Sequence, residues 1–185
     1  MLDPLIPRLQ AWIFAKDPQG RAVAEGNDVV VHFSLLGAPQ QLRIQYVPTH
    51  SWTLLYTATC PDAKERWFLE SKWVWFPEHG GAKRVKLPPL DDRYKLYASD
   101  EAFFGAVFSG RGLQDLFHRF EEGDHVKASL QDGALKVAFK VRFNPRFTNR
   151  EAVLANWAEV VYALGGLCFK GVQLAVMTSR IENKE

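Results

Sequence analysis

Two alternating segments joined by Asp132-Gly133 constrain the fold more than any other feature of this sequence. Apolar residues occupy every second position in 126–130 and again in 135–143. An Asp-Gly pair between two such segments favours a type I′ turn, which fixes the register of a β-hairpin. The turn then pairs Leu130 with Leu135, Ala128 with Val137 and Val126 with Phe139. The opposite side of the hairpin carries Ser129, Lys136, His125 and Lys140. One face is therefore apolar and the other polar, as in an antiparallel sheet covered on one side.

Alternation earlier in the chain predicts three or four further antiparallel strands. The segments 29–35, 41–46 and 52–60 each alternate apolar with polar residues, and turn-forming sequences separate them. Threonine and aromatic residues favour strand over helix in the third segment. A fourth strand is expected over 67–76, closed by Pro77, with a helical turn over 62–69 as the alternative for its start. Together these segments predict an antiparallel meander.

Apolar residues at helical spacing predict the helices. They indicate a first helix over 4–15, a pair over about 99–108 and 113–123, and a closing helix from Thr148. Thr148 and Glu151 match a capping box, and Gly165-Gly166 is expected to end the closing helix. The apolar tail 167–177 fits strand and helix equally well. Residues 16–27 are expected to form a loop, 94–98 a short strand, and 83–86 a short basic strand or loop.

Length and composition fit a single α+β domain. The chain has 185 residues, of which 47% are hydrophobic and 24% are charged, as in ordinary globular domains. Residues 1–87 and 91–185 form two halves that meet at Pro88-Pro89, a sequence that favours a boundary. The expected fold is a twisted antiparallel sheet, built from the meander and the hairpin and covered by helices on one face.

Charge and cysteine content argue against several functional classes. The 23 basic residues nearly balance the 21 acidic ones, and Lys83, Arg84 and Lys86 form the one short basic run, so nucleic-acid binding is not expected. Cys60 and Cys168 stand far apart among apolar residues, which indicates buried, inert thiols rather than a redox or zinc motif. We also expect neither a signal peptide nor a membrane span, and therefore a cytoplasmic protein. No cofactor or metal ion is expected.

The order of elements resembles the secretion-chaperone-like α+β fold, in which helices cover one side of a twisted antiparallel sheet. That resemblance implies dimerisation and the binding of partner proteins. A second resemblance covers about residues 94–164 and rests on Tyr94–Asp100, the helix pair, Asp132–Leu135 and the closing helix. This part is similar to a bacterial domain family of uncharacterised function. The family implies no catalytic residues, and many of its members look membrane-tethered.

A glycine-rich junction is a candidate anion site. Gly110, Arg111 and Gly112 open the second helix of the predicted pair. Backbone amides at a helix N-terminus, together with a guanidinium group, can hold a phosphate or a carboxylate. The alternative is a helix break with flexible glycines, and we favour that interpretation.

A histidine between two carboxylates is the second polar candidate. Asp115, His118 and Glu122 fall on one side of the same helix, an arrangement that suits acid–base chemistry or a metal ion. The alternative is a solvated helix face on which Arg111 pairs with Asp115 four residues later. We favour the solvated face.

Aromatic residues crowd into the fourth expected strand. They make up 13% of the chain, and Trp67, Trp73, Trp75 and Phe76 fall within ten residues of one another. Large apolar groups lie on both faces of this strand, unlike a strand with a single dry face. Exposed tryptophans concentrate in protein interfaces, so these four residues are candidates for one. The alternatives are a sheet core and an apolar ligand pocket.

Two functional hypotheses follow. The first is a non-catalytic protein that binds another protein, as a chaperone or adaptor does, and forms a homodimer. It predicts an exposed apolar surface that involves Trp73, Trp75 and Phe76. The second is a small enzyme or ligand-binding protein with a pocket between the sheet and the helices. It predicts a cavity in which Arg111, His118 or His79 meets other polar groups.

Overall fold

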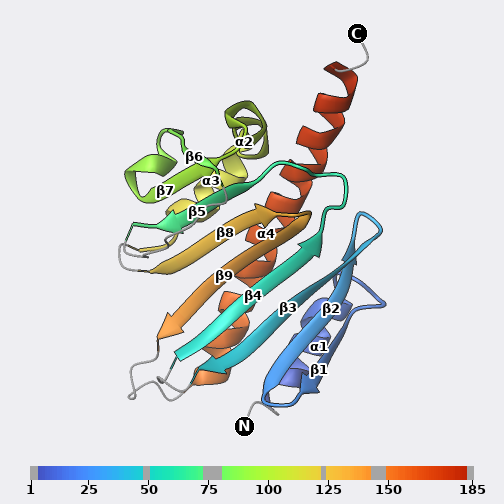
Figure 1. The fold of residues 1–185 in the computed structure, drawn as a ribbon. Coiled ribbons are helices and arrows are strands. Elements are labelled where there is room, and N and C mark those ends of the chain that lie inside the picture. Colours follow the sequence, from blue (N-terminus) through green and yellow to red (C-terminus); the bar gives the residue numbers. More distant parts are fainter. Residues whose placement is uncertain (1–3, 48–50, 73–80, 122–123, 143–148, 183–185) are drawn as a thin grey trace.

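One antiparallel sheet forms the body of the protein. The computed structural model describes residues 4–47, 51–72, 81–121, 124–142 and 149–182. Within them, nine strands follow the order β1-β2-β3-β4-β9-β8-β5-β7-β6 (Figure 1). The strands are β1 (Arg21–Glu25), β2 (Asp28–Leu35), β3 (Ala38–Val47), β4 (Ser51–Thr59), β5 (Trp67–Ser71), β6 (Lys83–Arg84), β7 (Tyr94–Ala98), β8 (His125–Gln131) and β9 (Ala134–Arg142). The expected α+β class and antiparallel sheet are confirmed.

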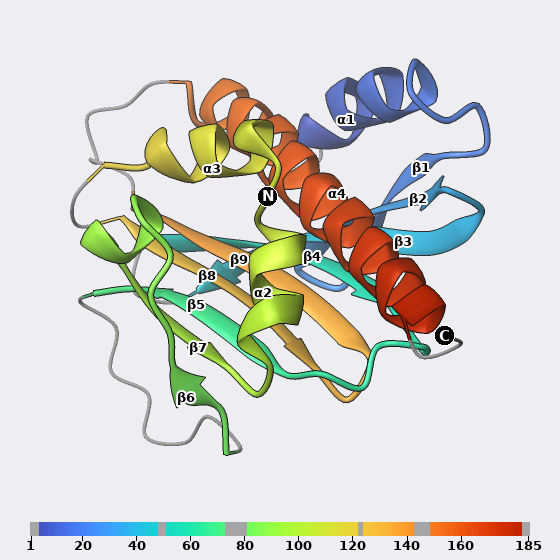
Figure 2. The ribbon, with the colours of Figure 1, turned by 90° about the horizontal axis from the view of Figure 1, so that it is seen from above.

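The helices lie on one side of this sheet. They are α1 (Leu5–Phe14), the short 3-10 helix η1 (Leu90–Asp92), α2 (Glu101–Val107), α3 (Arg111–His118) and α4 (Arg150–Glu182). Figure 2 shows the four α-helices above the sheet, and no described helix covers the side below. We call the covered side the helix face and the other side the outer face. This arrangement confirms the predicted one-sided covering.

The β8–β9 hairpin has the register that its sequence predicts. Leu130 pairs with Leu135, Ala128 with Val137 and Val126 with Phe139. Asp132 and Gly133 adopt φ angles of 50° and 71°, as a type I′ turn requires. The hairpin lies between β4 and β5, because β9 pairs with β4 and β8 pairs with β5. Strands from both ends of the sequence therefore share one sheet.

The closing helix continues far beyond Gly165-Gly166, so the prediction that these glycines end it is wrong. α4 runs for 33 residues, about 50 Å at 1.5 Å per residue, and includes the segment 167–177. A Cβ atom on Gly165 would lie 2.3 Å from Cγ of Tyr56, and one on Gly171 would lie 2.5 Å from the carbonyl oxygen of Val107. These glycines let α4 approach β4 and α2 closely.

The start of one predicted helix and the end of another are defined by side-chain hydrogen bonds. The described N-cap of α4 is Asn149, whose Oδ1 accepts a hydrogen bond of 3.2 Å from the backbone of Ala152, while Thr148 lies outside the described residues. α3 ends at His118 rather than near residue 123. Nη1 of Arg93 donates to the carbonyl of His118 at the end of α3 (3.1 Å) and to the carbonyl of Phe120 just beyond it (2.9 Å).

An edge strand occupies part of the predicted 16–27 loop. β1 pairs with β2 from Arg21–His32 to Glu25–Asp28. The side chain of Gln10 on α1 lies along the free edge of β1, where its amide makes two hydrogen bonds. Its Oε1 accepts from the backbone of Ala22 at 2.7 Å, and its Nε2 donates to the carbonyl of Gly20 at 3.0 Å. Gln10 thus provides the hydrogen bonds that a neighbouring strand would make.

Candidate functional site

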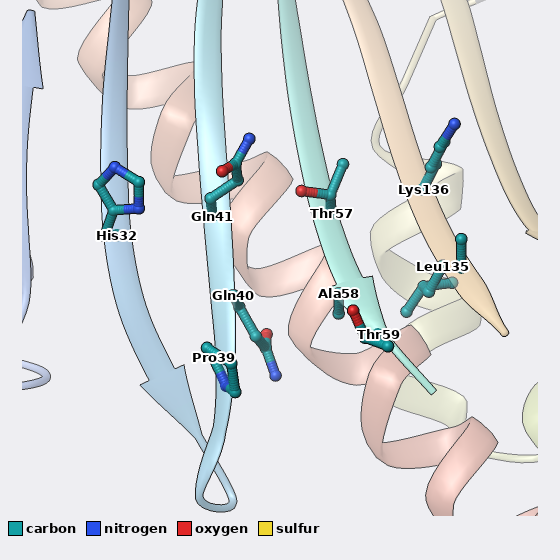
Figure 3. Close-up of a pocket in the computed structure, with 10 residues that line it drawn as sticks. His32, Pro39, Gln40, Gln41, Thr57, Ala58, Thr59, Leu135 and Lys136 are labelled. Carbon is teal, nitrogen blue, oxygen red and sulfur yellow. The ribbon is translucent and has the colours of Figure 1, made fainter. Parts of the chain in front are cut away.

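A pocket of about 270 Å³ opens on the outer face, near one end of the central strands (Figure 3). Its floor is a row of polar side chains on four neighbouring strands: His32, Gln41, Thr57 and Lys136. Strands lie about 4.8 Å apart, so this row is roughly 14 Å long. The remaining lining residues are Pro39, Gln40, Ala58, Thr59, Ala134 and Leu135. The pocket can therefore offer several hydrogen-bond donors to an extended ligand.

The two ends of this row differ in charge. At the β2 end, Glu25 contacts Nε2 of His32 at 3.2 Å and Nη2 of Arg43 at 2.7 Å. Arg43 also pairs with Asp28 at 3.0 Å. The hydrogen bond from Arg43, followed by that from His32, holds the pKa of the Glu25 carboxyl below its ordinary value of 4.5. At the β9 end, Lys136 is exposed and makes no ion pair within the described part of the chain.

Trp67 is part of the core, which corrects its place among the interface candidates. Its side chain is 0% exposed, and its ring packs edge-on against Phe104 and Phe108, with centroids 6.0 and 5.2 Å apart. Residue 67 points to the helix face, where these rings exclude water. The other three interface candidates, Trp73, Trp75 and Phe76, lie outside the described residues.

The Gly110-Arg111-Gly112 junction is the exposed start of α3. Gly110 is the N-cap and supplies no side-chain hydrogen bond. A Cβ atom on Gly112 would lie 4.0 Å from a methyl group of Leu167 on α4. Arg111 is exposed, and no described ion pair involves it. The side-chain hydrogen bonds beside this junction are local, since Ser109 Oγ donates to the carbonyl of Ala106 (2.9 Å) and Gln114 Nε2 donates to that of Phe108 (2.8 Å).

The acid–base candidates are spread along the surface of α3. Asp115 is exposed and His118 is half-buried, while Glu122 lies outside the described residues. The Nε2 atom of His118 is buried and has no hydrogen-bond partner among the described residues. Among the described residues, no three His, Cys, Asp or Glu side chains gather closely enough to hold a metal ion. Neither Arg111 nor His118 lines the outer-face pocket.

Both cysteines are buried, as the sequence predicts. Burial raises the pKa of the Cys60 thiol from 9.0 to about 11 and raises the pKa of the Cys168 thiol as well. Thiols with such pKa values stay protonated at neutral pH, and the thiolate is the nucleophilic form. The two cysteines are therefore parts of the core rather than nucleophiles.

An exposed apolar stripe on α4 is the feature that the sequence analysis missed. Leu174, Met177 and Ile181 are 64%, 61% and 65% exposed, and their spacing places them on one side of the helix. This stripe lies on the C-terminal part of α4, which extends past the strands (Figure 1). The same spacing is present in the sequence, but it indicates a stripe only once 167–177 is known to be helical.

α4 is also long and apolar enough, by length and composition alone, to cross a membrane. Of its most apolar 18-residue window, 56% is buried inside this fold. The helix face of the sheet covers much of that window, and a long core helix has the same composition. Packing inside the fold thus accounts for the buried part of this window.

Comparisons with known proteins identify the fold. No family model matches the chain, and no curated protein matches it either. Among solved structures, the chain is similar to the crystal structure of the mycobacterial trehalose monomycolate transport factor A, TtfA. The TM-score is 0.52 with 13% identity, and the match covers 88% of this chain and 93% of that chain. At this identity the likeness concerns the fold.

Proposed function

We propose that this protein is a non-catalytic accessory factor whose α4 tail binds an apolar helical segment of a partner protein. The observation that carries the proposal is the stripe of Leu174, Met177 and Ile181, each more than 60% exposed. Apolar side chains grouped in this way are commonly covered by a partner. The part of α4 that carries the stripe extends past the strands of the sheet (Figure 1).

The dimensions of the stripe indicate the kind of partner. Seven residues separate Leu174 from Ile181, a ridge about 10 Å long. Such a ridge fits the groove between side chains of a second helix. A stable dimer generally buries about 800 Å² and 20–30 residues on each side, far more than three side chains provide. The stripe therefore suits a reversible contact with another protein better than a permanent homodimer.

Two further observations support a non-catalytic role. The described residues hold no metal-binding cluster, and both thiols are buried. TtfA is named as a transport factor, and a protein of similar fold with that role supports an accessory function. We therefore keep the hypothesis of a chaperone- or adaptor-like protein, with the α4 stripe as its proposed binding surface.

A site-specific photocrosslinker tests the proposal. Placed at Met177 in cells, it should join one protein that is not captured from Thr178, an exposed polar neighbour on the same turn. The captured protein is then purified, and its affinity for three forms of this chain is measured. Leu174→Asp with Met177→Asp should weaken binding at least about tenfold, whereas Thr178→Asp should change it little.

The result that contradicts the proposal is equally specific. If the double variant binds the purified protein as tightly as the wild type does, the contact lies elsewhere. A crosslink from Met177 to a second copy of this chain, with dimeric mass in solution, shows self-association instead. Since the substituted side chains are exposed, all variants should keep the unfolding midpoint of the wild type.

A further inference from the structure

The four central strands of the sheet contain no acidic residue. The neighbours β3, β4, β9 and β8 together hold Arg43, Lys127, Lys136, Lys140 and Arg142, but neither Asp nor Glu. The whole chain is close to neutral, with 23 basic and 21 acidic residues. The fold therefore separates charges that are evenly mixed along the sequence.

The positive charge of the outer face is concentrated on β9. Arg43 is neutralised by Glu25 and Asp28, and Lys127 is paired in register with Glu70. Lys136 and Lys140 make no ion pair within the described chain. They are two pleats apart on the same face, about 14 Å along the strand.

Hydrogen-bonding groups surround these two lysines. Thr57 and Ser129 flank Lys136 in register, and Thr53 flanks Lys140. The pocket next to Lys136 adds the amide of Gln41 (Figure 3). Carboxylates accept hydrogen bonds from hydroxyl, amide and ammonium groups, and bonds to a charged partner are stronger than neutral ones.

We propose that the outer face around Lys136 and Lys140 binds an acidic segment of a protein. The charge of this face selects an anionic ligand. Proteins that bind single-stranded nucleic acid stack bases chiefly on Phe, Tyr and Trp side chains. The outer-face positions of β3, β4, β8 and β9 hold none of these three residue types, and His125 is the one imidazole among them. A row of Gln, Thr and Lys side chains suits the carboxylates of an extended polypeptide instead.

This binding surface lies on the opposite side of the sheet from α4 (Figure 2). It is therefore distinct from the α4 stripe, and it goes beyond the proposed function. Occupation of one surface leaves the other accessible, so the two proposals can fail separately.

A fluorescent oligoglutamate peptide is the probe for this surface. It should bind the full chain at low ionic strength, and binding should weaken as salt rises, since exposed charges are screened over about 8 Å at physiological salt. Lys136→Glu should weaken binding at least about tenfold, as expected when an attractive charge becomes repulsive. Lys170→Glu makes the same charge change at an exposed position on α4 and should change binding less than about twofold.

A neutral variant separates the pocket from general electrostatics. Thr57→Val removes a hydroxyl but no charge, and it should weaken oligoglutamate binding by about threefold to tenfold. Leu174→Asp with Met177→Asp is expected to weaken it no more than Lys170→Glu does, since these residues lie on the helix side. A thermal melt of each variant checks that the fold is intact.

Three results overturn the proposal. The first is no binding of oligoglutamate at low salt. The second is equal weakening by Lys136→Glu and Lys170→Glu, which indicates an unspecific response to net charge. The third is tighter binding of an oligothymidylate than of oligoglutamate, which assigns the face to nucleic acid.

Discussion

Gly165 shows how a single residue can control the packing of a whole helix. It sits in the middle of α4, where glycine is a poor helix former. The absence of a Cβ atom allows the Tyr56 ring to contact the helix backbone, since a Cβ atom there would be 2.3 Å from Cγ. Tyr56 is itself fully buried and donates its hydroxyl to Gln40, so the ring has little freedom to move away.

We predict that Gly165→Ala destabilises the protein by about 1–3 kcal/mol, the usual cost of overpacking a core. The better helix propensity of alanine, about 1 kcal/mol, offsets part of this loss. Gly105 on α2 is the matched control, because nothing lies within 4 Å of a Cβ atom there. Gly105→Ala should leave stability unchanged or raise it slightly. Urea unfolding of both variants measures the difference, and equal midpoints would contradict the close approach.

At the scale of elements, the two edges of the sheet are protected in different ways. β6 has two residues, Lys83 and Arg84, and a short charged edge resists pairing with another sheet. β1 is longer, and Gln10 hydrogen-bonds to the backbone of Ala22 within it and of Gly20 just before it. Sheet extension is therefore a poor route to self-association.

The Gln10 contact gives a prediction for β1. Gln10→Ala removes two partly buried hydrogen bonds and should lower the free energy of unfolding by about 1–2 kcal/mol. It also frees the edge of β1, so the variant should associate more at high concentration, as measured by light scattering. Gln45→Ala, at an exposed position on β3, should match the wild type in both respects. Wild-type behaviour of Gln10→Ala would show that the edge needs no protection.

For the whole molecule, α4 is the element that unites the core. It crosses the helix face of the sheet diagonally (Figure 2) and extends past the strands (Figure 1). Its second half is as deeply placed as its first, with Cys168, Phe169, Val172, Ala175 and Val176 all buried. A domain that ended at Gly165-Gly166 would leave the surfaces beneath these residues exposed to water.

We predict that a chain terminated after Gly166 loses cooperative unfolding, because it lacks these five core side chains and each is worth roughly 1–3 kcal/mol. A chain terminated after Ser179 is the control. It loses the exposed ion pair between Arg180 and Asp62 at 2.7 Å, and such pairs contribute about 0–1 kcal/mol. Circular dichroism and urea unfolding distinguish the two. Cooperative unfolding of the shorter chain would show that the second half of α4 is dispensable.

Local patterns were sufficient for several parts of this structure. The hairpin register from Val126 to Phe139 follows from a two-residue periodicity and one turn sequence, both encoded within 14 residues. The burial of Cys60 and Cys168 follows from their apolar neighbours. The one-sided covering of the sheet follows from alternation, because a strand with one polar face needs apolar cover on the other face alone.

The tertiary structure decided what depends on contacts between distant segments. Gly165-Gly166 has the composition of a helix end, yet Tyr56 and Leu35 occupy the space beside these glycines, so the helix continues. The hairpin lies between β4 and β5, so β8 and β9 join β3 and β4 in a group of four neighbouring strands without acidic residues. This group forms a basic outer face, which the near-neutral sequence does not indicate. Local sequence determines periodicity and turns, whereas close packing and charge separation depend on which segments become neighbours.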